Sequence, residues 1–169
     1  MSEKKWLDGY SGQTTIELIS LQGEYQTDSI VLAFEEALDQ KAERIGQSRL
    51  TADGKVVLAI EALEREVNNG GYGQFFINSS KSYVPIVVDA LSRIGCSEVA
   101  LLTQHVIDAL GIDGQVTVEA IDSVMEEDSD KRDEKLGECD EQYYKVAGDL
   151  AGPLLEFIKK NKLGITVKG

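Results

Sequence analysis

The amino-acid sequence predicts an all-α fold, a single domain of packed α-helical hairpins. Apolar residues recur at helical spacing along most of the chain, whereas strand signals are weak. One strand-like run, residues 165–167, is too short and too near the chain end to seed a sheet. The 169 residues, 42% of them hydrophobic, suit one globular domain with its own core. Because no repeat, linker or shift in composition divides the chain, we expect one domain over residues 1–169.

The first predicted helix follows Thr27 and Asp28, two candidate capping residues, and ends at Gly46. Its apolar face consists of Val31, Phe34, Leu38, Ala42 and Ile45. A second helix is expected after Thr51, with Val56, Ile60, Leu63 and Val67 on one side. Residues 68–71 end it, because asparagine and glycine tolerate the left-handed conformation that a helix C-terminus requires.

Four further helices are expected in the middle of the chain. A short one covers residues 74–77, and Ser82 caps the next, which has Pro85 in its first turn, where a missing N–H costs little. Ser97 and Thr117 cap the other two. The three longer helices have the apolar faces Val84, Val87, Val88, Leu91 and Ile94; Val99, Leu102, Val106 and Leu110; and Val118, Ile121, Val124 and Met125.

Two helical segments are expected near the end of the chain. Residues 143–146 suggest a helix that residues 152–153, Gly-Pro, break or kink. Residues 154–158 supply the last apolar stripe. The lysines that follow it complement the negative end of the helix dipole.

The charge is strongly acidic and unevenly placed. Thirty acids against 17 bases give a net charge of −13, which argues against direct binding to nucleic acid or to an anionic membrane and permits a basic protein partner. Residues 119–141 alone hold 11 acids and 3 bases, a net charge of −8. Such biased blocks are typical of interaction surfaces or mobile loops, and solubility is the alternative explanation.

Membrane spans and secretion are not expected. The apolar runs are far shorter than the roughly 20 residues that cross a bilayer. The N-terminal residues lack the apolar core of a signal peptide, so we expect a cytoplasmic protein.

The sequence shows no catalytic, metal-binding or cofactor motif. The chain has one histidine, His105, which we interpret as a part-buried structural residue. Cys96 and Cys139 have no metal-ligand spacing and are expected to be reduced thiols. A glycine-rich phosphate loop at Gly71 and a calcium loop at Asp128 both fail the required patterns. We therefore predict a protein that binds a partner and is not an enzyme.

The least ordinary segment is residues 66–79, where amides, glycines and aromatic residues gather between two apolar helices. We expect a helix stop, a tight turn and a restart, with Gly70 at a left-handed position. Gln74 and Asn78 lie one turn apart and are expected to bond free backbone groups. The alternative is a small polar pocket. The motif residues, which we interpret as structural, are Asn69, Gly70, Gly71, Gln74 and Asn78.

The same segment resembles the motif of a bacterial family of unknown-function domains named after a DNA-mimic protein. The matching residues are Glu66, Asn69, Gly70, Gly71, Tyr72, Gln74, Phe75, Phe76 and Asn78. Residues 29–35 and the Asp-x-x-Tyr-Tyr run at 140–144 look like an early and a late helix of that family, and the resemblance extends over about residues 11–162. It implies an all-α fold. For the founding member it implies binding to a transcription regulator in place of DNA.

Three hypotheses for the function remain. The first is a regulator whose acidic face occupies the DNA-binding surface of a basic protein, such as a transcription regulator. The second is an acidic interaction or immunity-type scaffold without DNA mimicry, and the third is an enzyme with a polar pocket near Gln74 and Asn78. The predicted partner contacts of the first are Glu126, Glu127, Asp128, Asp130, Asp133, Glu134, Glu138, Asp140 and Glu141.

A charge comparison limits the first hypothesis. If residues 119–141 were fully helical, they would span roughly 35 Å, and duplex DNA of that length carries about 20 phosphates. The block has a net charge of only −8. Mimicry therefore needs acids from other helices or from a second subunit, which leaves a homodimer open.

Overall fold

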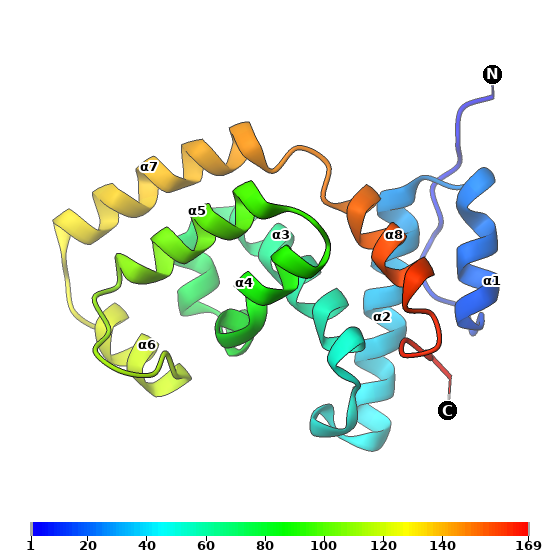
Figure 1. Ribbon diagram of the computed structural model, residues 1–169, viewed down its shortest axis with the longest axis horizontal. Helices are drawn as coiled ribbons and strands as arrows, with labels where there is room; N and C mark the ends of the chain where they lie inside the picture. The colour runs from blue at the N-terminus through cyan, green and yellow to red at the C-terminus, as the bar shows by residue number, and fades with distance from the viewer. Residues whose placement is uncertain (1, 169) are drawn as a thin grey trace. The chain divides into compact units, whose positions relative to one another are not determined.

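The computed structural model describes residues 2–168, and the regular structure within them is helical (Figure 1). The described residues contain no strand, only an isolated bridge between Lys5 and Tyr25. The prediction of an all-α fold is thus confirmed. The contacts within the chain divide it into two compact units, and the boundaries follow Glu61 and Gly148. The first unit contains the two ends of the described chain, and the second unit is the continuous segment Ala62–Gly148. The expectation of a single domain stays a prediction.

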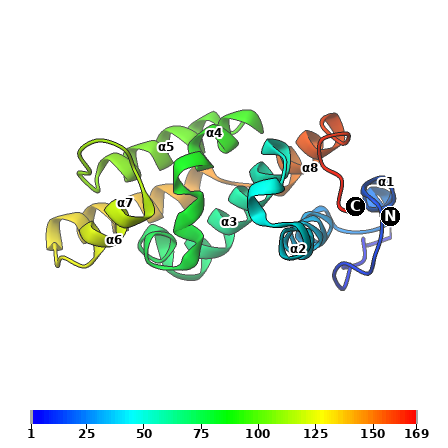
Figure 2. The same cartoon turned by 90° about the horizontal axis from the view of Figure 1, so that it is seen from below.

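The first unit is built around helix α2 (Thr27–Ile45). Helices α1 (Thr15–Ser20) and α8 (Ala151–Lys160) both pack against it, as the two views of the ribbon show (Figures 1 and 2). The start of helix α3 (Ala52–Ile77) belongs to the same unit. The core is filled by Leu18, Ile30, Phe34, Leu38, Leu154, Leu155 and Ile158, all at most 1% exposed.

A segment after α8 closes the first unit. Ile165 and Val167 are buried, and the backbone carbonyl of Ile165 accepts a hydrogen bond of 2.5 Å from the hydroxyl of Thr15. The ammonium of Lys41, a residue only 9% exposed, donates to the backbone carbonyl of Thr166 at 2.6 Å and to its hydroxyl at 3.0 Å. These bonds join residues that lie 125 and 150 positions apart.

The second unit contains the rest of α3 and four more helices. These helices are α4 (Val84–Arg93), α5 (Ser97–Asp108), α6 (Val118–Met125) and α7 (Asp130–Val146). Helix α5 packs against both α4 and α7, and α6 packs against a 3₁₀ turn, Ser79–Tyr83. The core of this unit includes Leu63, Tyr72, Phe75, Phe76, Leu91, Val106 and Tyr143.

Some predicted helix boundaries are exact and others are wrong. Helix α6 begins after Thr117, whose side chain accepts from the Ala120 N–H at 3.1 Å, as predicted. Ser82 does not cap a helix, because it lies inside the 3₁₀ turn, although Pro85 does fall in the first turn of α4. Residues 152–153 do not break a helix. They lie in the first turn of α8, where a proline lacks no helical hydrogen bond.

Two other helices begin at residues different from those predicted, and one helix was not predicted at all. The N-cap of α2 is Gln26, which makes no side-chain capping bond, and Thr27 and Asp28 are already helical. Helix α5 starts at Ser97 itself. Helix α1 was not predicted, although Thr14 and Glu17 form a complete capping box at its start.

No helix within residues 2–168 has the length and apolar character needed to span a bilayer.

Candidate interaction surface

Two glycines interrupt helix α3. Gly70 has φ −160° and Gly71 has φ +77° with ψ −177°, whereas residues 52–69 and 72–77 on either side are helical. The left-handed residue is therefore Gly71, and the expectation of such a conformation at Gly70 is wrong. Gly71 occupies a region of backbone space that essentially only glycine adopts. At Gly70 the constraint is steric, because a Cβ atom there would lie 2.1 Å from Oε1 of Gln74.

The carboxylate of Glu66 organises the chain on both sides of this break. Its Oε2 accepts from Nε2 of Gln74 at 2.7 Å and from Nδ2 of Asn78 at 2.9 Å, and its Oε1 accepts from Oγ of Ser80 at 2.9 Å. Gln74 and Asn78 thus bond a side chain, and the expectation that they bond free backbone groups is wrong. The alternative hypothesis was a polar pocket near these two amides. Both amides instead donate to the carboxylate of Glu66.

The electrostatics of Glu66 fit a saturated carboxylate. The residue is 7% exposed, and burial alone would raise the pKa of its carboxyl group. The three hydrogen bonds, helped by the nearby charge of Arg65, outweigh burial and lower the pKa below its ordinary value of 4.5. Glu66 therefore stays ionised and holds its three donors in place.

Helix α7 is fastened to the same break. A carboxylate oxygen of Asp140 accepts from the backbone N–H of Tyr72 at 2.8 Å. The hydroxyl of Tyr143 donates to Glu64, and the hydroxyl of Tyr144 donates to the carbonyl of Val67 at 2.9 Å. Burial raises the pKa of the Asp140 carboxyl group, and the hydrogen bond from Tyr72 opposes that rise. The Asp-x-x-Tyr-Tyr run thus serves as an attachment of α7 to α3.

Tyr72 extends this attachment into the core. Its ring meets that of Tyr143 edge to face, with centroids 5.8 Å apart. Its hydroxyl shares a buried hydrogen bond of 2.8 Å with that of Thr103 on α5, and burial raises the pKa of the Tyr72 hydroxyl well above its ordinary value. Asn69, by contrast, is exposed. The contacts support a structural role for Gly70, Gly71, Gln74 and Asn78.

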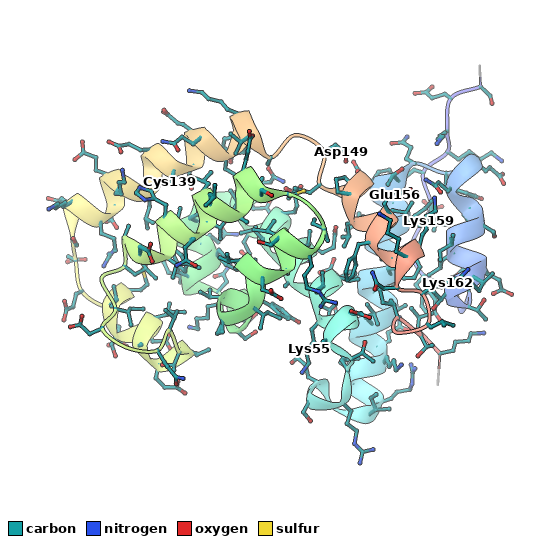
Figure 3. The ribbon with its side chains drawn as sticks, viewed as in Figure 1. Lys55, Cys139, Asp149, Glu156, Lys159 and Lys162 are labelled. Atoms are coloured by element: carbon teal, nitrogen blue, oxygen red, sulfur yellow. The ribbon has the colours of Figure 1, made fainter. Side chains whose placement is uncertain are left out.

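The turn between α6 and α7, together with helix α7, carries all nine predicted partner contacts. Eight of these acids are exposed, and we call them the acidic surface: Glu126, Glu127, Asp128, Asp130, Asp133, Glu134, Glu138 and Glu141. The ninth, Asp140, is half-buried and bonded to Tyr72. In Figure 3 many side chains of α6 and α7 end in oxygen atoms and point outward. The second unit has 17 acids and 7 bases, so it holds −10 of the net charge of −13.

Arg132 holds the turn between α6 and α7. Its side chain is 10% exposed, and its guanidinium donates to the carbonyls of Val124 at 2.8 Å and Glu127 at 2.9 Å. The Val124 carbonyl belongs to the last turn of α6, which has no basic residue of its own, and the Glu127 carbonyl belongs to the turn that follows. At the other side of the turn, the hydroxyl of Ser129 accepts from the backbone N–H of Arg132 at 3.2 Å and caps α7. The turn that bears three exposed acids is therefore fixed at both ends.

An open groove of about 680 Å³ lies between the end of α5 and the first half of α7. Its lining includes residues of both charges: His105, Asp108, Lys131, Arg132, Glu134, Lys135 and Glu138. His105 is exposed, so the expectation of a part-buried histidine is wrong. The groove borders the acidic surface, because Glu134 and Glu138 belong to both.

The remaining chemistry-bearing residues do not gather into a site. Cys96 and Cys139 are free thiols, and Cys139, labelled on α7 in Figure 3, is buried. Within the described part of the chain no three His, Cys, Asp or Glu side chains lie where they could hold a metal ion.

Comparison with known proteins identifies a family. The family model described as "DMP19-like protein" matches residues 48–161. The matched range includes the break in α3, the Glu66 contacts and the acidic surface. No curated protein and no solved structure matches the chain.

Proposed function

The chain belongs to the DMP19-like protein family, and on that premise we propose that it is a non-catalytic regulator that binds a basic protein on that protein's DNA-binding surface. The observation that carries the proposal is the acidic surface of α7 and of the turn before it. Its eight exposed acids lie on one continuous stretch of the second unit, which holds −10 of the net charge. A field of this sign attracts cationic protein surfaces and repels nucleic acid.

The spacing of acids along α7 supports mimicry of one DNA strand. Five exposed acids follow one another between Asp130 and Glu141, a rise of about 16 Å along an α-helix. One strand of duplex DNA carries about five phosphates over the same distance. Three bases lie on the same stretch of the helix. Arg132 pairs with Asp133 at 3.1 Å and Lys135 approaches Glu138 at 3.4 Å, so the net charge of the array is smaller than its five acids.

The attachment of α7 makes the display of these acids rigid. Asp140, Tyr143 and Tyr144 bond α7 to α3, and Arg132 bonds its start to the end of α6. A partner that meets a preformed array does not have to order it on binding, which favours affinity. Helix α7 therefore combines two kinds of residue: those that bond it to α3 and α6, and the exposed acids that these bonds hold in place.

The test begins with capture of the partner from the native host. Binding kinetics are then measured for the wild type and for a variant with four acids changed to amides, at 0.1 M and 1 M salt. The four positions are Glu126, Glu127, Asp128 and Glu141, which are exposed. We expect slower association for the variant and weaker wild-type binding at high salt, because the Debye length falls from about 10 Å to about 3 Å.

A matched control removes four exposed acids elsewhere: Glu3, Asp8, Glu43 and Asp113. Its charge equals that of the first variant, so equal losses from both would mean that total charge, and not the acidic surface, governs binding. Mimicry also requires that the protein and DNA exclude each other from the partner. A ternary complex with DNA would leave the acidic scaffold without mimicry as the function.

A further inference from the structure

Basic side chains line the groove beside the acidic surface. On α7, Lys131 and Lys135 are one helical turn apart, and Glu134 and Glu138 form the neighbouring column. Across the groove stand His105 and the other residues at the end of α5. Two lysines at this place reduce the attraction of the surface for cations, which indicates that they have another role.

The two lysines are weakly engaged within the protein. Lys131 is exposed and makes no hydrogen bond or ion pair to any of residues 2–168. Lys135 is half-buried and approaches Glu138 at 3.4 Å, a long ion pair between side chains that are 39% and 56% exposed. Arg132 differs, since its guanidinium is bonded to two carbonyls. Both lysines line the groove, where the ammonium of Lys131 is free to bind an external anion and that of Lys135 is held only by its long pair with Glu138.

The acids that line the groove limit the kind of anion that can bind there. Asp108, Glu134 and Glu138 also line the groove, so a free multivalent anion such as phosphate would be repelled. A single carboxylate that is flanked by cations fits better, because the lysines bind the carboxylate while the acids bind its neighbours. A volume of about 680 Å³ falls within the usual range of protein pockets and is ample for one side chain.

On the basis of the proposed function, we propose that the groove receives an Asp or Glu side chain of the basic partner, bound by Lys131 and Lys135. The groove is then a specificity site. It favours a protein surface of mixed charge over a uniformly cationic one. The cationic groups of a uniformly cationic surface would be repelled by the two lysines. Complementary placement of both signs gives specificity beyond what net charge supplies.

The test uses synthetic peptides as probes. One is a 12-residue peptide made of lysine alone, and each of the others has a single Glu at one of its positions. Each Glu lowers the positive charge of the peptide, so net charge alone predicts weaker binding at every position. With the wild type we expect at least one Glu peptide to bind about threefold tighter than the all-lysine peptide, the scale of one partly exposed ion pair.

Two double variants decide where the preference arises. Lys131→Gln with Lys135→Gln should abolish the preference and make the all-lysine peptide the tightest binder. Lys145→Gln with Lys162→Gln changes the net charge equally at exposed lysines outside the groove and should keep the preference. Melting curves check that all three proteins are folded.

The outcomes separate the two proposals. If the all-lysine peptide binds tightest to every protein, the groove proposal is wrong while the acidic surface stands. A Glu preference that survives loss of Lys131 and Lys135 also overturns the groove proposal. If no peptide binds in a salt-dependent manner, the proposed function fails together with it.

Discussion

The carboxylate of Asp140 accepts a hydrogen bond of 2.8 Å from the backbone N–H of Tyr72, 68 residues away in sequence. This bond brings helix α7 onto the break in α3, where Gly71 leaves room for the acid. A Cβ atom on Gly71 would lie 2.2 Å from Oδ2 of Asp140. The glycine and the acid thus depend on each other, although the sequence separates them widely.

Replacement of Gly71 should therefore be costly. We expect Gly71→Ala to lower the free energy of unfolding by about 2–4 kcal/mol, because the backbone conformation disfavours any side chain and the new methyl group displaces Asp140. Gly73→Ala is the matched control, since nothing lies within 4 Å of its Cβ position. Urea unfolding of both variants checks this, and equal stability of the two would contradict it.

Glu66 gives a prediction at neutral pH. Glu66→Gln replaces one acceptor oxygen with an NH₂ group, which must face donors from Gln74, Asn78 or Ser80. We expect a loss of about 1–3 kcal/mol in the free energy of unfolding. Glu141→Gln, at an exposed position, should change it by less than about 0.5 kcal/mol.

The same residue predicts a pH dependence. The pKa of Glu66 is lower in the folded protein than its ordinary value of 4.5, so its stabilising effect is complete above that value. The effect is lost as the pH falls through the folded pKa. The stability gap between wild type and Glu66→Gln should accordingly narrow below about pH 4.5. Urea titrations at pH 7 and pH 3.5 measure the gap, and a gap of constant size would show that charge on Glu66 is not what holds its donors.

Arg132 allows charge to be separated from structure. We expect Arg132→Gln to lower the free energy of unfolding by about 1–3 kcal/mol, because two carbonyls lose a charged donor. Lys131→Gln changes the net charge equally at an exposed side chain and should cost less than about 0.5 kcal/mol. Thermal melting of the pair tests this. If both variants melt together, Arg132 does not hold the turn.

Thr15 tests the closure of the first unit. Its hydroxyl donates to the carbonyl of Ile165 and accepts from the N–H of Val167 at 3.3 Å. Thr15→Val keeps the shape but leaves both backbone groups unpaired, and should cost about 1–3 kcal/mol. Thr15→Ser retains the hydroxyl and should recover most of that loss. The comparison is made by urea unfolding, and a serine variant as unstable as the valine one would refute the role of the hydroxyl.

Local signals predicted local structure. The start of helix α6 was predicted correctly, because the side chain of Thr117 does cap it and the apolar residues that follow have helical spacing. The capping box at Thr14 and Glu17 is an equally local signal for α1, which apolar spacing alone does not reveal. His105 was misjudged because it follows Leu101 by one turn, and Leu101 is itself 74% exposed.

Long-range contacts could not be predicted in this way. The acidity of residues 119–141 indicated an interaction surface, but nothing in the spacing separates Asp140, which bonds Tyr72, from its exposed neighbour Glu141. Glu64 and Thr103 were missed for the same reason, since their tyrosine partners lie 79 and 31 residues away. The break in α3 was predicted from the sequence, but the contact that excludes a side chain at Gly71 comes from Asp140, far along the chain.

The discontinuous first unit has a consequence for synthesis on the ribosome. The whole of the second unit, residues 62–148, is synthesised before α8 and the segment after it. Until then α2 lacks the helix that covers it, and Lys41 and Thr15 lack the backbone groups to which they donate. Domains generally fold from the N-terminus first during translation. In this protein α1 and α2 obtain their full set of contacts only after α8 and residues 165–167 have been synthesised, so the first unit cannot be complete before the second has been translated.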